Sequence, residues 1–293
     1  ATVTALMLSL SLVVSMGGIA RAVFDSIHNW ATVTLNPDLF VTPSQSLTER
    51  NFRFPASLGD ELAGIDGVDE IQRVRSHRIV YQGSPISLTA VEAKSLGDRT
   101  KRPPVEGPPD MYERAARGEG VILSDNFARL RGLHAGDTIE LATPSGARRL
   151  AILGLVVDWT DQTGMILMDR ASYVRWWGDD TVNVFRVYVK PGVRPQDVRQ
   201  RIIDRFAGTQ RLFVLTNREV QTWILGLAEQ WMSLAYAQIA IAVLVAILGI
   251  VNTLTVSIID RRRELGVLQA VGGMRNQVRR TIWMEAIAIG IVG

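Results

Sequence analysis

The feature that most constrains the fold of this chain is a stretch of thirty residues, 230–259, without a single Asp, Glu, Lys or Arg. As an α-helix, this stretch would measure about 45 Å at a rise of 1.5 Å per residue. The hydrocarbon core of a bilayer is about 30 Å thick, so such a helix crosses the membrane and leaves part of its length outside the lipid. The sequence therefore predicts an α-helical transmembrane protein.

An amphipathic stripe leads into this uncharged stretch from upstream. Its apolar residues recur at helical spacing: Val220, Trp223, Ile224, Leu227 and Trp231. No proline separates the stripe from the uncharged stretch. We therefore expect one continuous helix over about 218–259, a stalk fused to a transmembrane helix, with its last Trp near the lipid–water interface.

A second uncharged run lies at the start of the chain, over residues 1–20. It is just long enough to cross the hydrocarbon core, which takes about 20 apolar residues, and we expect a first transmembrane helix over 1–22. The alternative interpretation is a secretory signal peptide, because Gly18 and Ala20 resemble the small residues of a cleavage site. The run lacks an initiator Met and a charged leading region, which favours the spanning helix.

A third apolar run begins at Thr281 and continues to Gly293. We interpret residues 281–293 as the start of a third transmembrane helix. Glu285 lies inside this run, where a charge is costly and usually faces protein or water; alternatively, it belongs to the first turn at the lipid–water interface. Because the chain opens inside one apolar run and stops inside another, we expect a fragment of a longer protein.

The loop 260–280 between the second and third runs predicts the orientation in the membrane. It contains six Arg against one Asp and one Glu, a local charge of +4. Short loops rich in Arg remain in the cytoplasm, so the segment 23–217 is expected on the opposite side. The whole chain carries +3, so its remainder sums to −1 and no nucleic-acid partner is expected. This topology predicts a multi-pass protein of the cytoplasmic (inner) membrane.

Helix and strand signals alternate along the exported segment, which predicts a large extracytoplasmic α+β domain inserted between the first and second spans. Helices are expected over 57–65, 124–131 and 195–206. Strands are expected from Val68 onward and over 78–81, 86–91, 120–123, 137–142, 148–157, 182–189 and 212–215. Residues 97–110 hold four Pro and are expected to form a loop. We expect two lobes, with 80–180 as the β-rich one, and a bulge or close backbone approach at Gly154.

The residues of this chain do not predict a catalytic site. The sequence has no Cys, no phosphate-binding G-x-x-x-x-G-K-[ST] loop and no paired His spacing. Three His are isolated and are interpreted as solvated polar residues: His28, His77 and His134. Asp158 and Asp161 flank Trp159 but lack the third group that hydrolase chemistry requires. We expect neither enzymatic activity nor a metal or cofactor.

Residues 252–293 resemble the core of the FtsX-like permeases, the membrane subunits of ABC transporters that include the MacB and LolC/LolE types. The resemblance rests on an Arg-rich stretch with Glu-Leu-Gly, an Ala-x-Gly-like turn and an early Glu in the next span. These positions are Arg261, Arg262, Arg263, Glu264, Leu265, Gly266, Leu268, Ala270, Val271, Gly272 and Glu285. A looser similarity to the family's β-rich periplasmic lobe covers 120–124, 132–139 and 150–157. Because full modules of this family usually have four spans, the resemblance implies one half-module or fragment.

The resemblance implies a cytoplasmic ATPase subunit as the partner of a short coupling helix over 264–273. The expected coupling residues are Arg261, Arg262, Arg263, Glu264, Leu265, Gly266, Leu268, Ala270 and Gly272. Apolar residues of this element are suited to a groove in a partner protein; alternatively, the element lies on the membrane surface. A dimer with the same or a second permease module is expected, with contacts to membrane lipid.

The function implied is that of an ABC transporter permease. ATP hydrolysis in the partner would move the coupling helix, and the long helix would carry the motion to the exported domain. The substrate would be a lipoprotein, lipid, peptide or drug. Two alternatives are an FtsX-like regulator of cell division or the envelope that activates wall hydrolases, and a membrane-tethered ligand sensor. A sensor needs a cytoplasmic signalling module, for which 260–280 is short.

Overall fold

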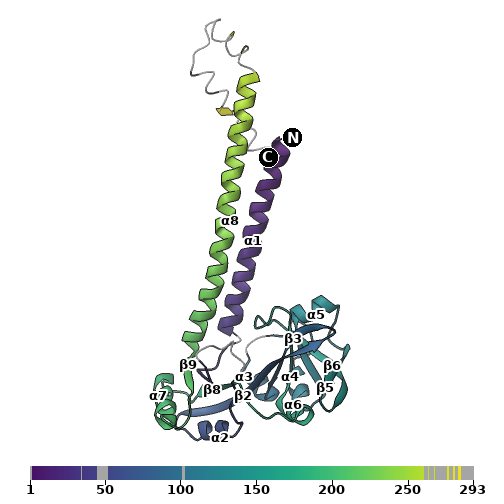
Figure 1. Ribbon diagram of the computed structural model, residues 1–293, viewed down its shortest axis with the longest axis vertical. Coiled ribbons are helices and arrows are strands. Elements are labelled where there is room, and N and C mark those ends of the chain that lie inside the picture. Colours follow the sequence, from purple (N-terminus) through teal and green to yellow (C-terminus); the bar gives the residue numbers. More distant parts are fainter. Residues whose placement is uncertain are drawn as a thin grey trace. The chain divides into compact units, whose positions relative to one another are not determined.

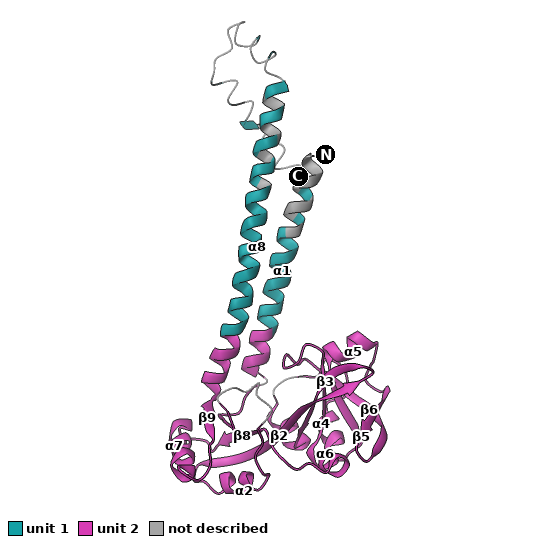
Figure 2. Ribbon diagram, viewed as in Figure 1, with its two compact units in different colours: residues 1–26, 226–293 teal, residues 27–225 magenta. Residues whose placement is uncertain are grey.

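The computed structural model describes residues 2–33, 35–44, 52–100 and 103–260, together with six single residues in the C-terminal part. These single residues are Arg263, Val267, Asn276, Arg280, Trp283 and Met284. The chain divides into two compact units, residues 27–225 and residues 1–26 with 226–293 (Figure 2).

Residues 27–225 form an α+β domain around one mixed sheet (Figure 1). Among the described residues, its nine strands lie in the order β5-β6-β4-β7-β3-β2-β8-β1-β9. Their bounds are β1 Leu39–Thr42, β2 Val68–Tyr81, β3 Ser84–Val91, β4 Gly120–Ser124, β5 Thr138–Thr143, β6 Gly146–Val156, β7 Met165–Asp169, β8 Val184–Val189 and β9 Phe213–Thr216.

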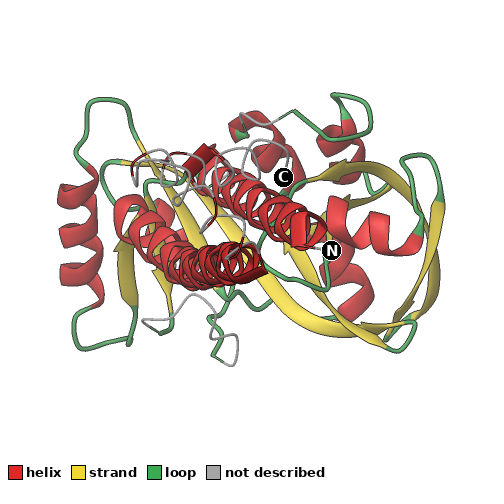
Figure 3. Ribbon diagram, turned by 90° about the horizontal axis from the view of Figure 1, so that it is seen from above, coloured by secondary structure: helices red, strands yellow, loops and turns green. Residues whose placement is uncertain are grey.

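Helices lie beside the strands in both halves of this sheet, as the view from above shows (Figure 3). The short helices are α2 Leu58–Ala63, α3 Ala93–Arg99, α4 Met111–Ala116, α5 Asp125–Arg131, α6 Arg170–Trp177 and α7 Pro195–Phe206. Two long helices begin or end in the domain and continue into the other unit: α1 Thr2–Val33 and α8 Asn217–Asp260.

The long strand β2 divides the sheet into two lobes. Residues 68–74 of its fourteen residues pair antiparallel with β8, whereas residues 75–81 pair antiparallel with β3. Each lobe has its own buried apolar cluster. In the first lobe, β1 and β8 pack against α2 and α7; in the second, β3, β4, β6 and β7 pack with α5 and α6. The lobe expected from about residue 80 thus begins inside β2, near Arg75.

Most local predictions for this domain are confirmed. The hairpin expected around 83–84 is the β2–β3 pair, whose turn residues Gln82 and Gly83 have φ values of 49° and 78°, as a tight two-residue hairpin turn requires. The second hairpin is the antiparallel β5–β6 pair. Helix α7 has the expected bounds, with Pro195 in its first turn.

Gly154 shows both features expected of it. The β4–β6 register shifts between Val121 and Ile122, which pair with Ile152 and Gly154. A Cβ atom at Gly154 would lie 2.4 Å from the sulfur of Met111 and 2.9 Å from the Glu106 carbonyl oxygen. Glycine is therefore required where the strand β6 passes close under α4.

The loop expected over 97–110 is wrong at its start, because α3 continues to Arg99. Gly97 lies inside this helix, where a Cβ atom would come within 2.6 Å of the Cβ of Tyr112. The glycine thus serves the close packing of α3 on α4 and does not end the helix. No prediction covered the strands β1 and β7 or the helices α3, α4 and α6.

The helix expected over 218–259 corresponds to α8, Asn217–Asp260. Of the described helices, one is long and apolar enough to cross a membrane, and that segment covers Asn217–Gly249. Helix α1 continues past the expected end at residue 22 to Val33, because 21–33 contains no Gly or Pro and buries Trp30 and Ala31 in the domain. In the unit of residues 1–26 and 226–293, a Cβ atom at Gly17 would lie 3.8 Å from Ile239 of α8, so the two helices lie side by side there.

Candidate functional site

The first turn of α8 follows β9 without a loop and begins with a capping box. The Thr216 hydroxyl accepts the Glu219 backbone N–H at 3.2 Å, and a Glu219 carboxylate oxygen accepts the Thr216 backbone N–H at 2.7 Å. The signal for this helix start, Thr-x-x-Glu before an apolar run, is present in the sequence and was not used in the prediction. The capping box fixes where the strand ends and the helix begins.

Hydrogen bonds tie the base of α8 to the segment that leaves α1. The Asn217 side-chain amide donates to the carbonyl oxygens of Leu35 and Pro37, at 2.5 and 2.6 Å. Its backbone N–H donates to Asp38 at 3.0 Å. One turn further, the Gln221 amide donates to the Ala31 carbonyl oxygen at 3.3 Å. Gln221 thus satisfies a carbonyl group in the last turn of α1. Asn217 holds the segment that follows this helix.

A small apolar cluster packs between the bases of the two helices and the sheet. Its buried residues are Trp30, Ala31, Leu35, Phe40 and Val220, and Leu215 and Ile224 pack against it while partly buried. The cluster therefore joins α1, β1, β9 and α8 within the unit 27–225. We call this set of packed and hydrogen-bonded residues the helix-base junction.

The strand order determines to which strands the helix-base junction attaches the two long helices. β1 pairs antiparallel with β8 on one side and with β9 on the other. The chain thus connects α1 to β1 and β9 to α8, so both long helices are attached to adjacent strands at one end of the sheet. An ion pair of 3.3 Å between Arg199 of α7 and Glu219 adds a third helix to the attachment.

The predicted stalk residues differ in their surroundings. Val220 is buried in the helix-base junction, with 2% of its surface exposed, and Ile224 packs against it. Trp223, Leu227 and Trp231 are 45%, 41% and 70% exposed. The stripe therefore packs on the domain only in its first turns, and the role of its outer residues as a stalk stays a prediction.

The predicted coupling residues lie mostly outside the described part of the chain. Of them, the structure describes Arg263 alone, an exposed residue in helical conformation. Val267, within the predicted coupling helix, is 63% exposed. The coupling helix over 264–273 and its contact with an ATPase stay predictions.

A buried polar cluster lies where β2 changes its pairing partner. The Arg75 guanidinium, 4% exposed, donates to Asp179 and Asn183 at 2.8 Å each. Tyr173 and Thr181 also donate to the Asp179 carboxylate. Burial opposes ionisation of Asp179, but hydrogen bonds from Thr181 and Arg75 outweigh it and hold its pKa well below the usual range. Burial raises the pKa of Tyr173 to about 12.

Two of the isolated His and both members of the Asp pair contact other residues of the domain. His134 lies 3.3 Å from the Glu106 carboxylate at the surface, and the His77 ring is partly buried beside Tyr173 and Trp177. Asp158 caps a turn by accepting the Thr160 N–H. The buried Asp161 accepts from the Thr163 backbone and hydroxyl and pairs with Arg78. None of these contacts forms a nucleophile–base pair.

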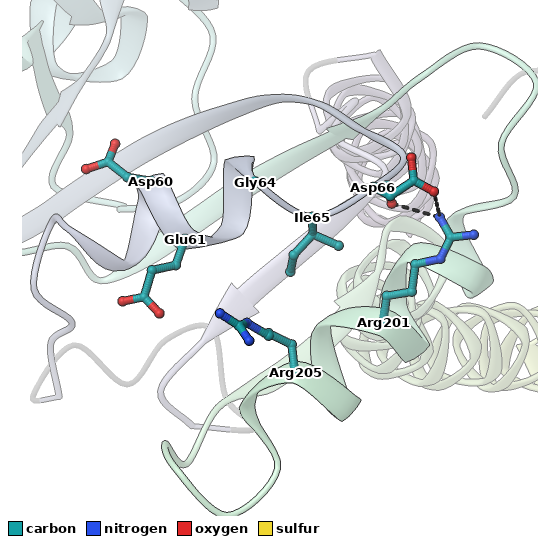
Figure 4. Close-up of a pocket in the computed structure, with 7 residues that line it drawn as sticks. All are labelled: Asp60, Glu61, Gly64, Ile65, Asp66, Arg201 and Arg205. Atoms are coloured by element: carbon teal, nitrogen blue, oxygen red, sulfur yellow. Dashed lines mark hydrogen bonds and ion pairs between the residues drawn. The ribbon is translucent and has the colours of Figure 1, made fainter.

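A mixed-charge cleft of about 460 Å³ opens between α2 and α7 (Figure 4). Its lining residues are Asp60, Glu61, Gly64, Ile65, Asp66, Arg201 and Arg205. Arg201 pairs with Asp66 at 3.0 Å across the rim. In the part of the chain that the structure describes, no group of three or more His, Asp or Glu side chains is placed to hold a metal ion.

Two family models match parts of the chain. A model of the MacB-like periplasmic core domain matches residues 1–205, and a model of the FtsX-like permease C-terminal region matches residues 236–293. The periplasmic region of MacB from Actinobacillus actinomycetemcomitans aligns with 64% of this chain and 92% of its own, at 10% identity and a TM-score of 0.44.

Curated relatives carry related descriptions. An uncharacterized ABC transporter permease of Mycobacterium tuberculosis is 26% identical over 98% of this chain and 34% of its own length. A macrolide export ATP-binding/permease protein of Paracoccus denitrificans is 24% identical over 63% of this chain and 29% of its own. The chain thus spans about a third of the length of these relatives. Because the MacB-like model matches more than half of the chain and the FtsX-like model matches its C-terminal part, this chain belongs to the ABC transporter permeases of the MacB and FtsX-like type.

Proposed function

We propose that this chain is the part of a permease subunit that transmits ATP-driven motion from a cytoplasmic ATPase to an extracytoplasmic domain. The motion would extrude or release a substrate such as a lipoprotein, lipid, peptide or drug. Two relatives support the class of function through their descriptions, macrolide export in Paracoccus denitrificans and pyoverdine export in Pseudomonas fluorescens.

The topology proposed with this function is multi-pass. Residues 1–22 form a first span, 218–259 a stalk with a second span, and 281–293 the start of a third. The exported domain lies between the first two spans, and the loop 260–280 faces the cytoplasm because of its six Arg. The working unit is a dimer of permease modules with an ATPase bound at the coupling helix.

The observation that carries the proposal is the helix-base junction. Transmission requires that a displaced helix moves the domain and does not slide past it. The capping box, the Asn217 hydrogen bonds and the buried Val220 attach α8 to β9, β1 and the end of α1. A continuous helix of 44 residues, about 66 Å long, is long enough to join this junction to a cytoplasmic contact.

The test targets the proposed coupling helix in the full-length permease. Leu268→Asp places a charge on its apolar side, and we expect recovery of the ATPase subunit in pull-downs from membranes to fall at least tenfold. The physical reason is that burial of an unpaired carboxylate opposes docking. Gln269→Asp adds the same charge at a neighbouring polar position and serves as the matched control, with recovery close to wild type.

Unchanged ATPase recovery with Leu268→Asp, in a protein that reaches the membrane in normal amounts, would refute the coupling assignment. Equal losses in both variants would assign the effect to added negative charge in a basic loop, which also contradicts an apolar docking face.

A further inference from the structure

Arg186 on β8 is a cation for which the described residues supply no acceptor. It lies on the sheet face opposite the core that receives its neighbours Phe185 and Val187. Its side chain is partly buried. Among the residues that the structure describes, none accepts a hydrogen bond from its guanidinium or forms an ion pair with it. Burial lowers the pKa of Arg186, and because a guanidinium stays protonated in proteins, the positive charge is held partly out of water at a cost in stability.

The residues that flank Arg186 across the sheet do not supply an acceptor. Phe40 of β1 and Gln72 of β2 are its direct cross-strand neighbours. Phe40 is apolar, and the buried Gln72 side chain is already engaged. Its amide nitrogen donates to Ser95 at 2.6 Å, and its oxygen accepts the Tyr188 hydroxyl at 3.4 Å.

The carboxylates that attract Arg186 electrostatically, Glu92 and Asp158, are engaged elsewhere. One Glu92 oxygen accepts the Arg73 backbone N–H at 2.8 Å, and the other lies 3.7 Å from the Arg73 guanidinium. Asp158 accepts the Thr160 N–H at 2.9 Å. Among the described interactions, neither carboxylate forms a hydrogen bond or an ion pair with the guanidinium of Arg186.

A second donor without an acceptor lies on the same face. The Trp30 side chain is 4% exposed, and its buried Nε1–H has no hydrogen-bond partner. Trp30 packs in the same cluster as Phe40, the residue that pairs with Arg186 across β1 and β8. Buried polar groups in native proteins are nearly always satisfied. The buried Nε1–H of Trp30, on the same face as the partly exposed Arg186, therefore indicates an acceptor that the described residues do not supply.

We propose that this face of the sheet binds an oxyanion, a phosphate or carboxylate group, through the guanidinium of Arg186. A planar guanidinium matches both groups with two parallel hydrogen bonds. The partial exposure of Arg186 allows such a group to arrive from solvent. The proposed site lies wholly within residues 27–225, so binding is measurable at equilibrium without the ATPase.

The test measures binding to the purified full-length permease in a neutral detergent by calorimetry. The probes are inorganic phosphate, dihexanoyl phosphatidic acid and hexanoate. We expect at least one of them to bind the wild type and Arg186→Gln to weaken that binding at least tenfold, through the loss of a charge-assisted pair of hydrogen bonds. Phosphate binding identifies a free-anion site, whereas binding of the lipid or hexanoate alone identifies an amphiphile. Arg205→Gln, at an exposed arginine of α7, should bind as the wild type does.

Thermal unfolding without any probe gives an independent readout. Because Arg186→Gln removes an uncompensated charge, the variant should unfold at the same temperature as the wild type or at a higher one. A lower unfolding temperature, or a variant that does not fold, would show that the protein itself satisfies Arg186 and would overturn the proposal. Absence of binding to the wild type, or equal binding by wild type and Arg186→Gln, would overturn it as well.

Discussion

At the scale of single residues, Arg75 connects the two lobes of the exported domain. It lies at the first position of β2 that pairs with β3, and it reaches Asp179 and Asn183, 104 and 108 residues later in the chain. Every acceptor that it contacts belongs to the connection between α6 and β8 or to its own strand. A buried ion pair is not by itself stabilising, but removal of one member leaves the other charge buried and unpaired.

Asp179→Asn should therefore lower the free energy of unfolding by about 3 kcal/mol, because the neutral amide leaves the buried Arg75 charge uncompensated. Thermal unfolding of the purified protein, followed by tryptophan fluorescence, measures the change. The control is Asp197→Asn, which removes an exposed pair with Arg194 on α7 and should cost less than about 1 kcal/mol.

The loss of stability caused by Asp179→Asn is expected to depend on pH. The pKa of Asp179 is lower in the folded protein than its usual value, so its contribution is complete above the unfolded pKa of about 3.9 and is lost as pH falls toward the folded pKa. The difference in stability between wild type and Asp179→Asn should shrink below about pH 4. A difference that stays constant between pH 6 and pH 3 would contradict this assignment of the charge.

At the scale of elements, α8 combines a fixed base with a long exposed run. Its first turn is capped, hydrogen-bonded and buried at Val220, whereas Leu227 is 41% exposed. The position of the rest of α8 relative to its base therefore depends on the continuity of the helix and not on packing against the sheet. This is the property that transmission of motion would use.

Leu227→Pro tests that continuity. Proline removes the backbone N–H that bonds to the Trp223 carbonyl group and destabilises a helix interior by about 3 kcal/mol. We expect the full-length permease to reach the membrane and to retain its ATPase partner, while transport per ATP hydrolysed falls severalfold in reconstituted vesicles. Leu227→Ala shortens the same side chain but keeps the helix and should transport normally. Normal coupling in the proline variant would show that α8 does not transmit motion.

At the scale of the whole molecule, the proposed topology places residues of the domain and of the loop 260–280 on opposite sides of the membrane. These 293 residues contain no Cys, so a single cysteine introduced among them is the only thiol in this part of the protein. Lys190 in the exported domain and Asn276 in the loop are both exposed and suit this purpose.

In intact protoplasts, a membrane-impermeant maleimide should label Lys190→Cys, and it should label Asn276→Cys only after permeabilisation. The asymmetry follows from the Arg-rich loop, which resists transfer across the membrane. Labelling is read by mass shift on a gel. Equal labelling of both positions in intact protoplasts would place them in one compartment and contradict the topology.

Local signals accounted for a large part of the domain. The turn at Gln82-Gly83, the left-handed Gly132 after α5 and the proline at the start of α7 act on neighbouring residues, so their effect is readable from sequence. Ser124 shows the limit of such signals. It precedes α5 as a cap would, but its hydroxyl makes no capping bond to the helix and accepts the N–H of Met165 from a strand 41 residues away.

Short-range periodicity and composition predicted the long apolar helix, the two hairpins and helix α7. The motif in residues 252–293 predicted the family of the chain. Long-range contacts set the sharing of β2 between two lobes, the place of β1 between β8 and β9 and, among the described residues, the lack of an acceptor for Arg186. The physical reason is that strand pairing and side-chain burial join residues far apart in the chain. Such contacts depend on which faces meet after folding, and no local pattern encodes that.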